Sequence, residues 1–317
     1  MERYKILVLD NFEEYFFKDL REYADVIKAA SITGLEDSLQ EIDILVVRSN
    51  SKVDKELVDK MPRMKLVITA THGEDHIDKV YLKEKNIDYY NAPVQTFYVA
   101  QGAIAAMLAL NTRLVEGDRS MKNGKWRKND LVGSSLFNKN LGIIGYGRIG
   151  KEVAKLALSF GMKVCAYDPY VKTADANVTL CGLDELLKES DIVSIHLPLT
   201  DETKGLIGKK EFEMMKKGAF FVNLSRGGIV DEKALLEALK TGRLKGCALD
   251  VYSEEPPFKK IVLQELIKLE NVIATPHSIA QTEEAIRDKG NRVIEIIEKF
   301  YEKQKNIVKA TKTSVKK

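Results

Sequence analysis

The sequence has 317 residues, of which 50 are lysine or arginine and 47 are aspartate or glutamate, so the formal net charge is only +3. A balance this even creates no field strong enough to indicate a nucleic acid or a membrane surface as a partner. The length is sufficient for two hydrophobic cores of ordinary size. No apolar segment at the N-terminus resembles a signal peptide, so we expect a two-domain cytoplasmic protein.

The first part of the chain alternates short apolar strands with helical patterns. Strands are expected at 5–10, 24–28, 43–49, 65–71 and 87–90. Apolar strands separated by amphipathic helices are typical of a parallel sheet with helices on both faces. The next apolar run, FYVAQGAIAAMLAL at 97–110, is too short to cross a bilayer and is expected to form a buried helix.

A second series of strands occupies the middle of the chain. Its strands are expected at 141–145, 163–167, 191–198, 219–225, 246–251 and 271–277. Six parallel strands are the number found in a complete dinucleotide-binding sheet. After residue 280, one long helix is expected, because acidic residues begin this segment and lysines end it, as the helix dipole favours.

The first strand of the second series leads directly into a glycine-rich motif. Gly145, Gly147 and Gly150 have the spacing G-x-G-x-x-G, and a helical pattern follows. The first glycine permits a tight turn, the second lets the backbone approach a pyrophosphate, and the third lets the helix pack on the strand. Asp168 follows the next strand, where an acidic side chain binds the ribose of NAD. We therefore predict NAD as the cofactor.

Cysteine and histidine positions indicate neither a disulfide nor a metal site. Cys165, Cys181 and Cys247 have no C-x-x-C spacing, so reduced thiols in the core are expected. His72 and His76 lie four residues apart, which would suit a metal on a helix. The residues between them fit a turn better than a helix, so no metal is expected.

Several motifs together resemble the D-isomer-specific 2-hydroxyacid dehydrogenase family. They are GIIGYGRIG, AYDP, HLPLT, the segment from MKKGAFF to SEEPP, and NVIATPH. The resemblance implies an α/β fold in which a Rossmann dinucleotide-binding domain is inserted into a flavodoxin-like substrate domain. The substrate domain would comprise residues 1–99 and 283–317, and the NAD-binding domain residues 100–282. The resemblance also implies a small 2-keto or 2-hydroxy acid as substrate and a homodimer as the assembly.

Three residues near strand ends of the second series match the catalytic set of this family. Arg226 has forked donors that suit a substrate carboxylate, and His277 can exchange a proton near neutral pH. Glu255 would hold the imidazole and favour its charged form. Taken singly, each residue has a plainer interpretation: a surface arginine, an exposed loop glutamate and a histidine satisfied in the core.

The resemblance assigns further contacts residue by residue. Arg148 and Ile149 would contact the pyrophosphate through their backbones, and Asp250 would accept a hydrogen bond from the nicotinamide carboxamide. The other implied cofactor contacts are His72, Leu197, Leu224, Ser225 and Ala280. A loop in the first domain resembles the segment that binds the substrate carboxylate, and its implied contacts are Thr71, His72 and Gly73. Three positions depart from the family's usual residues, namely Thr71 and Ile279 for glycine and Gln101 for glutamate.

Two segments resemble the branch of the family that acts on a phosphorylated three-carbon hydroxy acid. They are RSNSKV at 48–53 and MKNGKWRKNDLVGSSL at 121–136. Arg48 is the expected contact of the phosphate, or else it holds the substrate domain together. The alternatives to this branch are a reductase of glyoxylate or hydroxypyruvate and a redox-sensing binding module. Larger members carry a C-terminal regulatory domain, and a short form without it is expected here.

Overall fold

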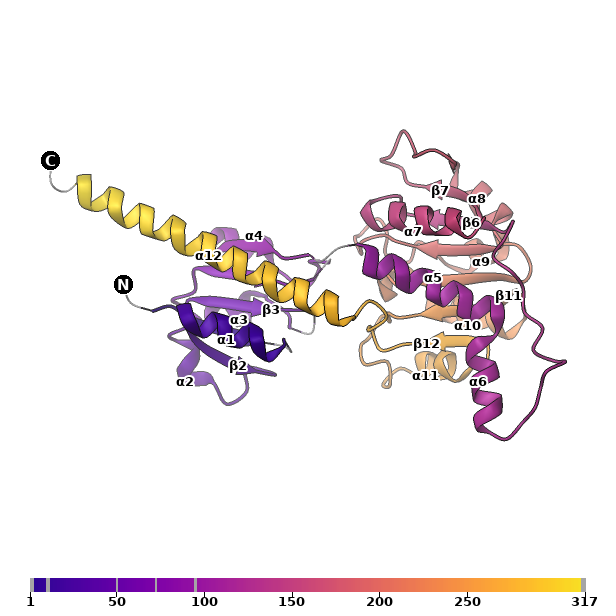
Figure 1. The fold of residues 1–317 in the computed structure, drawn as a ribbon, viewed down its shortest axis with the longest axis horizontal. Coiled ribbons are helices and arrows are strands. Elements are labelled where there is room, and N and C mark those ends of the chain that lie inside the picture. Colours follow the sequence, from indigo (N-terminus) through magenta and orange to yellow (C-terminus); the bar gives the residue numbers. More distant parts are fainter. Residues whose placement is uncertain (1–2, 10–11, 50, 72, 94–95, 315–317) are drawn as a thin grey trace. The chain divides into compact units, whose positions relative to one another are not determined.

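The residues described in the computed structural model are 3–9, 12–49, 51–71, 73–93 and 96–314. They form two compact units, unit 1 (Met1–Gln95 with Thr282–Lys317) and unit 2 (Thr96–Gln281) (Figure 1). The expected division lay after residues 99 and 282. Unit 2 instead begins at Thr96, so that α5 (Phe97–Thr112) belongs to it over its whole length, and it ends one residue earlier than expected, at Gln281. Among the helices of the described ranges, none combines the length and apolar character that a membrane crossing requires.

Unit 1 is built on a five-stranded parallel sheet with the order β2-β1-β3-β4-β5. Its strands are β1 (Lys5–Leu9), β2 (Asp25–Ala29), β3 (Ile44–Val47), β4 (Leu66–Thr69) and β5 (Asp88–Asn91). This is the flavodoxin-like order, in which the direction of strand addition reverses between β1 and β3. Every residue of β3 and β4 is buried, because helices cover both faces of the sheet.

The helices of unit 1 divide between the two faces of its sheet (Figure 1). They are α1 (Glu14–Tyr23), α2 (Glu36–Leu39), α3 (Lys55–Asp59), α4 (Lys79–Glu84) and α12 (Glu283–Ser314). On one face, Ile44 and Val46 of β3 share a core with α1 and with Val293 of α12. On the other face, Leu45 and Val47 share a core with α2, α3 and α4. The last helix of the chain therefore completes the unit that the N-terminal residues begin.

Unit 2 contains a seven-stranded parallel sheet with the order β12-β11-β10-β9-β6-β7-β8. Its strands are β6 (Asn140–Ile144), β7 (Lys163–Tyr167), β8 (Val178–Leu180), β9 (Ile192–Ile195), β10 (Ala219–Asn223), β11 (Leu244–Leu249) and β12 (Val272–Ala274). The order around β6 is that of a Rossmann fold, so the predicted α/β class is confirmed. The sheet has one strand more than the six expected, because the short β8 pairs with β7 at the edge.

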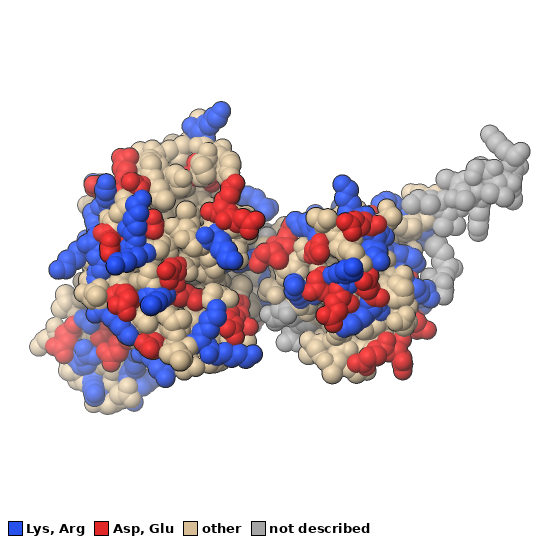
Figure 2. All heavy atoms as spheres, turned by 180° about the vertical axis from the view of Figure 1, so that it is seen from behind, with Lys and Arg blue, Asp and Glu red and all other residues tan. Residues whose placement is uncertain are grey.

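Helices also cover both faces of the sheet in unit 2. Besides α5 they are α6 (Leu114–Lys122), α7 (Arg148–Ser159), α8 (Leu183–Glu189), α9 (Lys209–Met214), α10 (Glu232–Lys240) and α11 (Ile261–Lys268). α5 and α7 pack on one face, where Ala103 and Met107 of α5 are buried, as the apolar run predicted. α8 to α11 pack on the other face. On the surface seen in Figure 2, positive and negative side chains are intermixed, in line with the small net charge.

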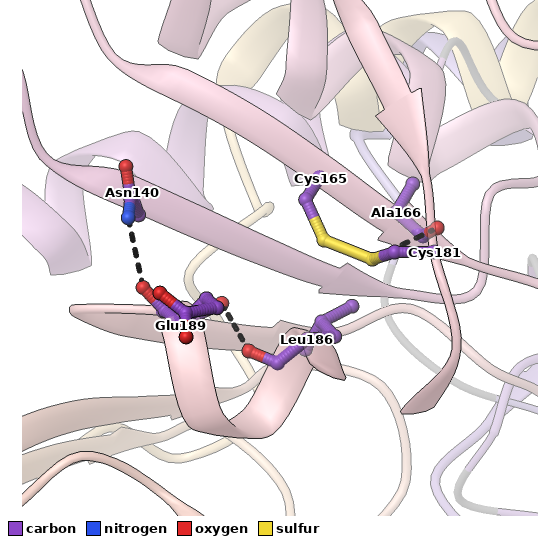
Figure 3. Close-up of a disulfide and its surroundings, with 7 residues drawn as sticks. Asn140, Cys165, Ala166, Cys181, Leu186 and Glu189 are labelled. Atoms are coloured by element: carbon purple, nitrogen blue, oxygen red, sulfur yellow. Dashed lines mark hydrogen bonds between the residues drawn. A yellow bond between two sulfur atoms is a disulfide. The ribbon is translucent and has the colours of Figure 1, made fainter. Parts of the chain in front are cut away.

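A disulfide joins Cys165 of β7 to Cys181, the residue after β8 (Figure 3). The expectation of reduced thiols is therefore wrong for these two residues, whereas Cys247 is free and buried. The reason is the unexpected strand β8, which pairs in parallel with β7 and brings Cys181 beside Ala166, whose carbonyl accepts from the Cys181 N–H. The Cα atoms of the two cysteines are 6.5 Å apart, although 16 residues separate them in sequence.

Candidate active site

The glycine-rich loop joins β6 to α7 at the centre of the unit 2 sheet. Gly145 has a φ of +96°, and a Cβ built on it would lie 2.6 Å from the carbonyl oxygen of His196. A Cβ on Gly150 would lie 2.2 Å from the carbonyl oxygen of Gly145, so helix and strand approach too closely for a side chain. A Cβ on Gly147 would meet no atom within 4 Å. The backbone at Gly147 is thus open to a ligand, as a pyrophosphate contact requires.

Asp168 lies directly after β7, and its carboxylate is held beside this loop. Oδ2 accepts from the backbone N–H of Tyr146 at 2.9 Å, and Oδ1 accepts from that of Tyr170 at 3.0 Å. These two bonds fix the position of the carboxylate relative to the glycines. A fixed acceptor at this place suits the hydroxyls of an adenosine ribose.

Arg226 follows β10 in a segment that is ordered by a buried asparagine. Asn223 donates from Nδ2 to the carbonyl oxygen of Arg226 at 2.9 Å, and its Oδ1 accepts from the N–H of Ser225 at 3.0 Å. The guanidinium also donates to the carbonyl of Ser225 at 2.7 Å. Asn223 was not among the residues predicted for the site, although a polar residue that ends the apolar strand AFFVN is a visible signal.

Glu255 and His277 form a hydrogen-bonded pair in the same unit. Oε2 of Glu255 lies 2.8 Å from Nδ1 of His277, and Oε1 accepts from the N–H of Tyr252 at 3.1 Å. Burial raises the pKa of Glu255, but the hydrogen bond and charge of His277 and the charge of Arg226 outweigh it, so the pKa is lowered. Of the three residues expected to be catalytic, Glu255 and His277 are therefore in direct contact, and the charge of Arg226 acts on Glu255. The pair leaves Nε2 of His277 for proton exchange.

Asp250 holds the loop that presents His277. Its Oδ1 accepts from the hydroxyl of Thr275 at 2.5 Å and from the N–H of Ser278 at 2.9 Å, and its Oδ2 accepts from the N–H of Ile279 at 3.2 Å. His277 lies between these anchors with a φ of +54°, a left-handed conformation that is uncommon outside glycine. Asp250 thus has a positioning role that the sequence did not reveal, besides the predicted contact with the carboxamide.

A second histidine near the loop is unsuited to proton transfer. Burial lowers the pKa of His196 to about 4, so the ring is neutral at physiological pH. Its Nε2 lies 2.9 Å from the hydroxyl of Ser194, and its backbone packs against Gly145. Of the histidines described in unit 2, His277 is therefore the better candidate for a catalytic acid.

The predicted substrate loop of unit 1 is ordered by threonine hydroxyls. Thr71 donates to the carbonyl oxygen of Gly73 at 2.6 Å and lies 2.9 Å from the hydroxyl of Thr69. Thr69 also lies 2.9 Å from Nε2 of His76. His72, predicted to contact both cofactor and substrate, lies outside the described residues. Within the described ranges, no group of three or more histidine, cysteine or acidic side chains is placed to hold a metal ion.

The remaining predicted contacts lie at ends of strands and helices. Arg148 and Ile149 begin α7 after the glycine-rich loop, and Leu224 and Ser225 directly follow β10. A methyl of Leu197 lies over Gly145, and Ala280 follows the segment held by Asp250. In unit 1, Arg48 follows β3 and is partly buried, with its Nε atom inaccessible to solvent.

Fold and site together define a dinucleotide-binding α/β protein with a histidine–glutamate pair. Residues 104–278 match the family model described as D-isomer specific 2-hydroxyacid dehydrogenase, NAD binding domain. The chain belongs to this family. The identification agrees with the resemblance seen in the sequence, and the NAD-binding domain it names is the one predicted.

Known relatives fall into more than one activity class. The chain is 41% identical over 302 residues to D-3-phosphoglycerate dehydrogenase of Methanocaldococcus jannaschii, with 93% of this chain and 57% of that protein covered. It is 43% identical over 264 residues to hydroxypyruvate reductase of Thermotoga maritima, with 83% and 85% covered. A D-lactate dehydrogenase from Aquifex aeolicus, complexed with NAD and lactic acid, superposes with a TM-score of 0.85 at 30% identity, over 96% and 98% of the two chains. The chain spans little more than half the length of the phosphoglycerate dehydrogenases it matches.

Proposed function

We propose that this chain is an NAD-dependent oxidoreductase that interconverts a D-2-hydroxy acid and its 2-keto acid. The observation on which the proposal depends is the 2.8 Å contact between Glu255 and His277, in the unit that also holds Arg226 and the glycine-rich loop. The open backbone at Gly147 fits a pyrophosphate, and the carboxylate of Asp168 fits a ribose that lacks a 2′-phosphate.

The chemistry follows from the groups in place. When bound, NADH would supply the hydride for reduction of the substrate's carbonyl carbon. Arg226 holds the substrate carboxylate through paired N–H donors. Nε2 of His277 donates a proton to the carbonyl oxygen, and the carboxylate of Glu255 stabilises the imidazolium that precedes this transfer. In oxidation, the same nitrogen accepts the proton.

For the substrate we propose D-3-phosphoglycerate, which is oxidised to 3-phosphohydroxypyruvate. The motif at 48–53 and the relatives named D-3-phosphoglycerate dehydrogenase support this choice. The second candidate is reduction of hydroxypyruvate or glyoxylate. The relative from Thermotoga maritima favours it, because the match covers 85% of that protein.

A panel of 2-keto acids tests both the proposed reaction class and the proposed substrate. We would follow NADH consumption with 3-phosphohydroxypyruvate, hydroxypyruvate and glyoxylate at matched concentrations. The expected result is the highest kcat/KM for the phosphorylated acid. A preference for hydroxypyruvate or glyoxylate would establish the second candidate. Binding of NADH without turnover of any 2-keto acid would contradict the enzyme assignment and favour a redox-sensing binding module.

For the assembly we propose a homodimer formed through unit 2. Large apolar side chains are exposed along the segment from α6 to β6. Their exposed fractions are 65% for Leu114, 77% for Trp126, 72% for Val132 and 65% for Phe137. Exposed aromatic and aliphatic side chains gathered on one segment are typical of a protein interface. Sedimentation at micromolar concentration should give a dimer, and a monomer would contradict this part of the proposal.

A further inference from the structure

The loop that carries Glu255 is bonded to the start of α10 through a serine. The carboxylate of Glu232, the first residue of α10, accepts from the backbone N–H of Ser253 at 2.7 Å and from its hydroxyl at 2.5 Å. The hydroxyl also accepts from Nζ of Lys260 at 2.9 Å, so its own proton is directed to Glu232. The N–H and the hydroxyl of Ser253 are thus held by one carboxylate.

Glu232 is not needed to cap the helix that it begins. The N-cap residue Asp231 already accepts from the N–H groups of Lys233 and Ala234, at 3.0 Å and 3.1 Å. An acidic residue in the first turn of a helix is ordinarily explained by the helix dipole. The dipole does not account for the two bonds of Glu232 to a loop that lies 21 residues later in the sequence. These bonds therefore call for an explanation in the loop itself.

Ser253 lies inside the turn that positions Glu255. The N–H of Tyr252 donates to Oε1 of Glu255 at 3.1 Å, and Oε2 of the same carboxylate lies 2.8 Å from Nδ1 of His277. The hydroxyl of Tyr252 donates to the carbonyl oxygen of Thr275 at 3.0 Å, in the segment that leads to His277. Because Ser253 joins Tyr252 to the residues that follow, its displacement would change the position of the Glu255 carboxylate relative to the imidazole.

Arg226 is held in place independently of Glu232. Asn223 donates from Nδ2 to the carbonyl oxygen of Arg226 at 2.9 Å. Gly227, the next residue, packs so closely on the backbone of Tyr252 that a Cβ on it would overlap that backbone. Removal of the Glu232 side chain should therefore affect the glutamate–histidine pair more than the arginine.

We infer that Glu232 is a positioning residue for the proton transfer, which acts by fixing Ser253 and thereby the orientation of Glu255 toward His277. The inference rests on the proposed dehydrogenase function and adds a residue to the groups that serve it. Reacting groups must be held to within about 0.5 Å, by side chains that are themselves fixed by supporting hydrogen bonds. The two bonds from Ser253 to Glu232 supply such support from a helix, which is more rigid than the loop.

Glu232→Ala tests the inference, because it removes both bonds to Ser253. We expect kcat for reduction of a 2-keto acid to fall about 10- to 100-fold, since a misplacement of about 1 Å costs up to about 100-fold. The dissociation constant of NADH should be unchanged. The alkaline limb of the pH–rate profile should move to lower pH, in the same direction as in Glu255→Gln but less far. Glu232→Gln, which keeps the side-chain length and an accepting oxygen, should restore most of kcat.

A double variant shows whether Glu232 acts through Glu255. If it does, Glu232→Ala should cost little further activity once Glu255 is glutamine, so the two losses should be far from additive in free energy. Glu237→Ala is the matched control, since Glu237 is exposed on the same helix and should leave kcat and the pH–rate profile unaffected. Additive losses in the double variant, or an unchanged kcat in Glu232→Ala, would overturn the inference.

Amide hydrogen exchange separates this inference from the proposed function. Exchange in residues 250–257 should be faster in Glu232→Ala than in the unmodified protein, and Glu237→Ala should match the unmodified protein. Unchanged exchange in Glu232→Ala would mean that its bonds do not hold the turn, and would overturn the inference. If exchange responds as expected while no 2-keto acid is turned over, the proposed function fails and the contact stands.

The opposite outcome is also distinguishable. If a 2-keto acid is turned over and the double variant shows additive losses, the positioning role fails alone. Should Glu232→Ala not fold, Ser253→Ala would take its place in every experiment. It removes the 2.5 Å bond of the hydroxyl and keeps that of the backbone N–H, so smaller effects in the same direction are expected.

Discussion

Nδ1 of His277 lies 2.8 Å from Oε2 of Glu255, although 22 residues separate the two in sequence. The carboxylate is oriented in turn by the backbone N–H of Tyr252, 3.1 Å from Oε1. Because an ionised carboxylate accepts from Nδ1, the proton exchanged with a substrate must reside on Nε2. This contact defines the atom through which we expect the chemistry to proceed.

Replacing His277 by alanine removes the proposed proton donor. We expect kcat to fall about 10²- to 10⁴-fold, the usual contribution of a placed general acid. The dissociation constant of NADH should change little, because the glycine-rich loop and Asp168 are untouched. Stopped-flow turnover and NADH fluorescence titration would measure the two quantities. An unchanged kcat would remove His277 from the mechanism.

Replacing Glu255 by glutamine removes the anion that stabilises the imidazolium. The pKa of Glu255 is lowered from its ordinary 4.5. Its carboxylate is therefore ionised near neutral pH, and its negative charge is lost only in acid. For the reduction reaction, in which His277 must carry a proton, we therefore expect the alkaline limb of the pH–rate profile to move to lower pH in Glu255→Gln. The reason is that the charged histidine loses its anionic partner. If the profile kept its position, Glu255 would have no part in the proton transfer.

Asp168 should direct cofactor choice toward NAD. A 2′-phosphate would bring like charges within a few ångströms of its carboxylate, which costs up to about 4 kcal/mol per pair of unit charges at an effective dielectric near 20. Kinetics with NADH and NADPH should show a strong preference for NADH, and Asp168→Asn should reduce it. Equal use of both cofactors by the unmodified protein would contradict this role.

Alanine substitutions at two glycines of the loop should have different effects, one on NADH binding and the other on stability. A Cβ on Gly147 meets nothing within 4 Å, so Gly147→Ala should change the free energy of unfolding by less than about 0.5 kcal/mol and weaken NADH binding. A Cβ on Gly150 would lie 2.2 Å from a carbonyl oxygen, so Gly150→Ala should destabilise the protein by about 1–3 kcal/mol. Denaturant unfolding of both variants and NADH titration of Gly147→Ala would measure these effects. Similar stability losses in both would show that the backbone at Gly147 is not open.

The disulfide should stabilise unit 2 by lowering the conformational entropy of its unfolded chain. For a sequence separation of 16 residues, the chain-entropy model gives about 3 kcal/mol. Thermal unfolding with and without a strong reductant should show a lower Tm after reduction, and Cys165→Ser with Cys181→Ser should reproduce it. As a control, alkylation of the denatured, unreduced chain should label only Cys247. Labelling of all three cysteines would mean that the bond does not form.

The fold class and the glycine-rich loop could be predicted because each depends on residues near one another in the chain. Apolar runs separated by amphipathic helices identify two parallel sheets, and the spacing of Gly145, Gly147 and Gly150 identifies the turn between β6 and α7. Arg226, Glu255 and His277 were selected because their side chains suit the chemistry at strand ends and match a family motif, and Glu255 was expected to hold the imidazole of His277. Their roles stay predictions that the variants above address.

Other features depend on contacts between segments that are distant in sequence, which only the tertiary structure decides. The Cys165–Cys181 bond exists because a three-residue strand pairs at the sheet edge, and three residues are too few for a periodic signal. The carboxylate of Asp250 accepts from the hydroxyl of Thr275 before His277 and from the backbone N–H of Ile279 after it, because β11 and β12 are neighbours in the sheet. Val293 of the last helix shares a core with Ile44 of β3, although about 250 residues separate them, because that helix packs on the sheet that the first residues form. The periodicity of the apolar residues indicates which face of a helix or strand is buried. Which other element packs against that face is determined only in the tertiary structure.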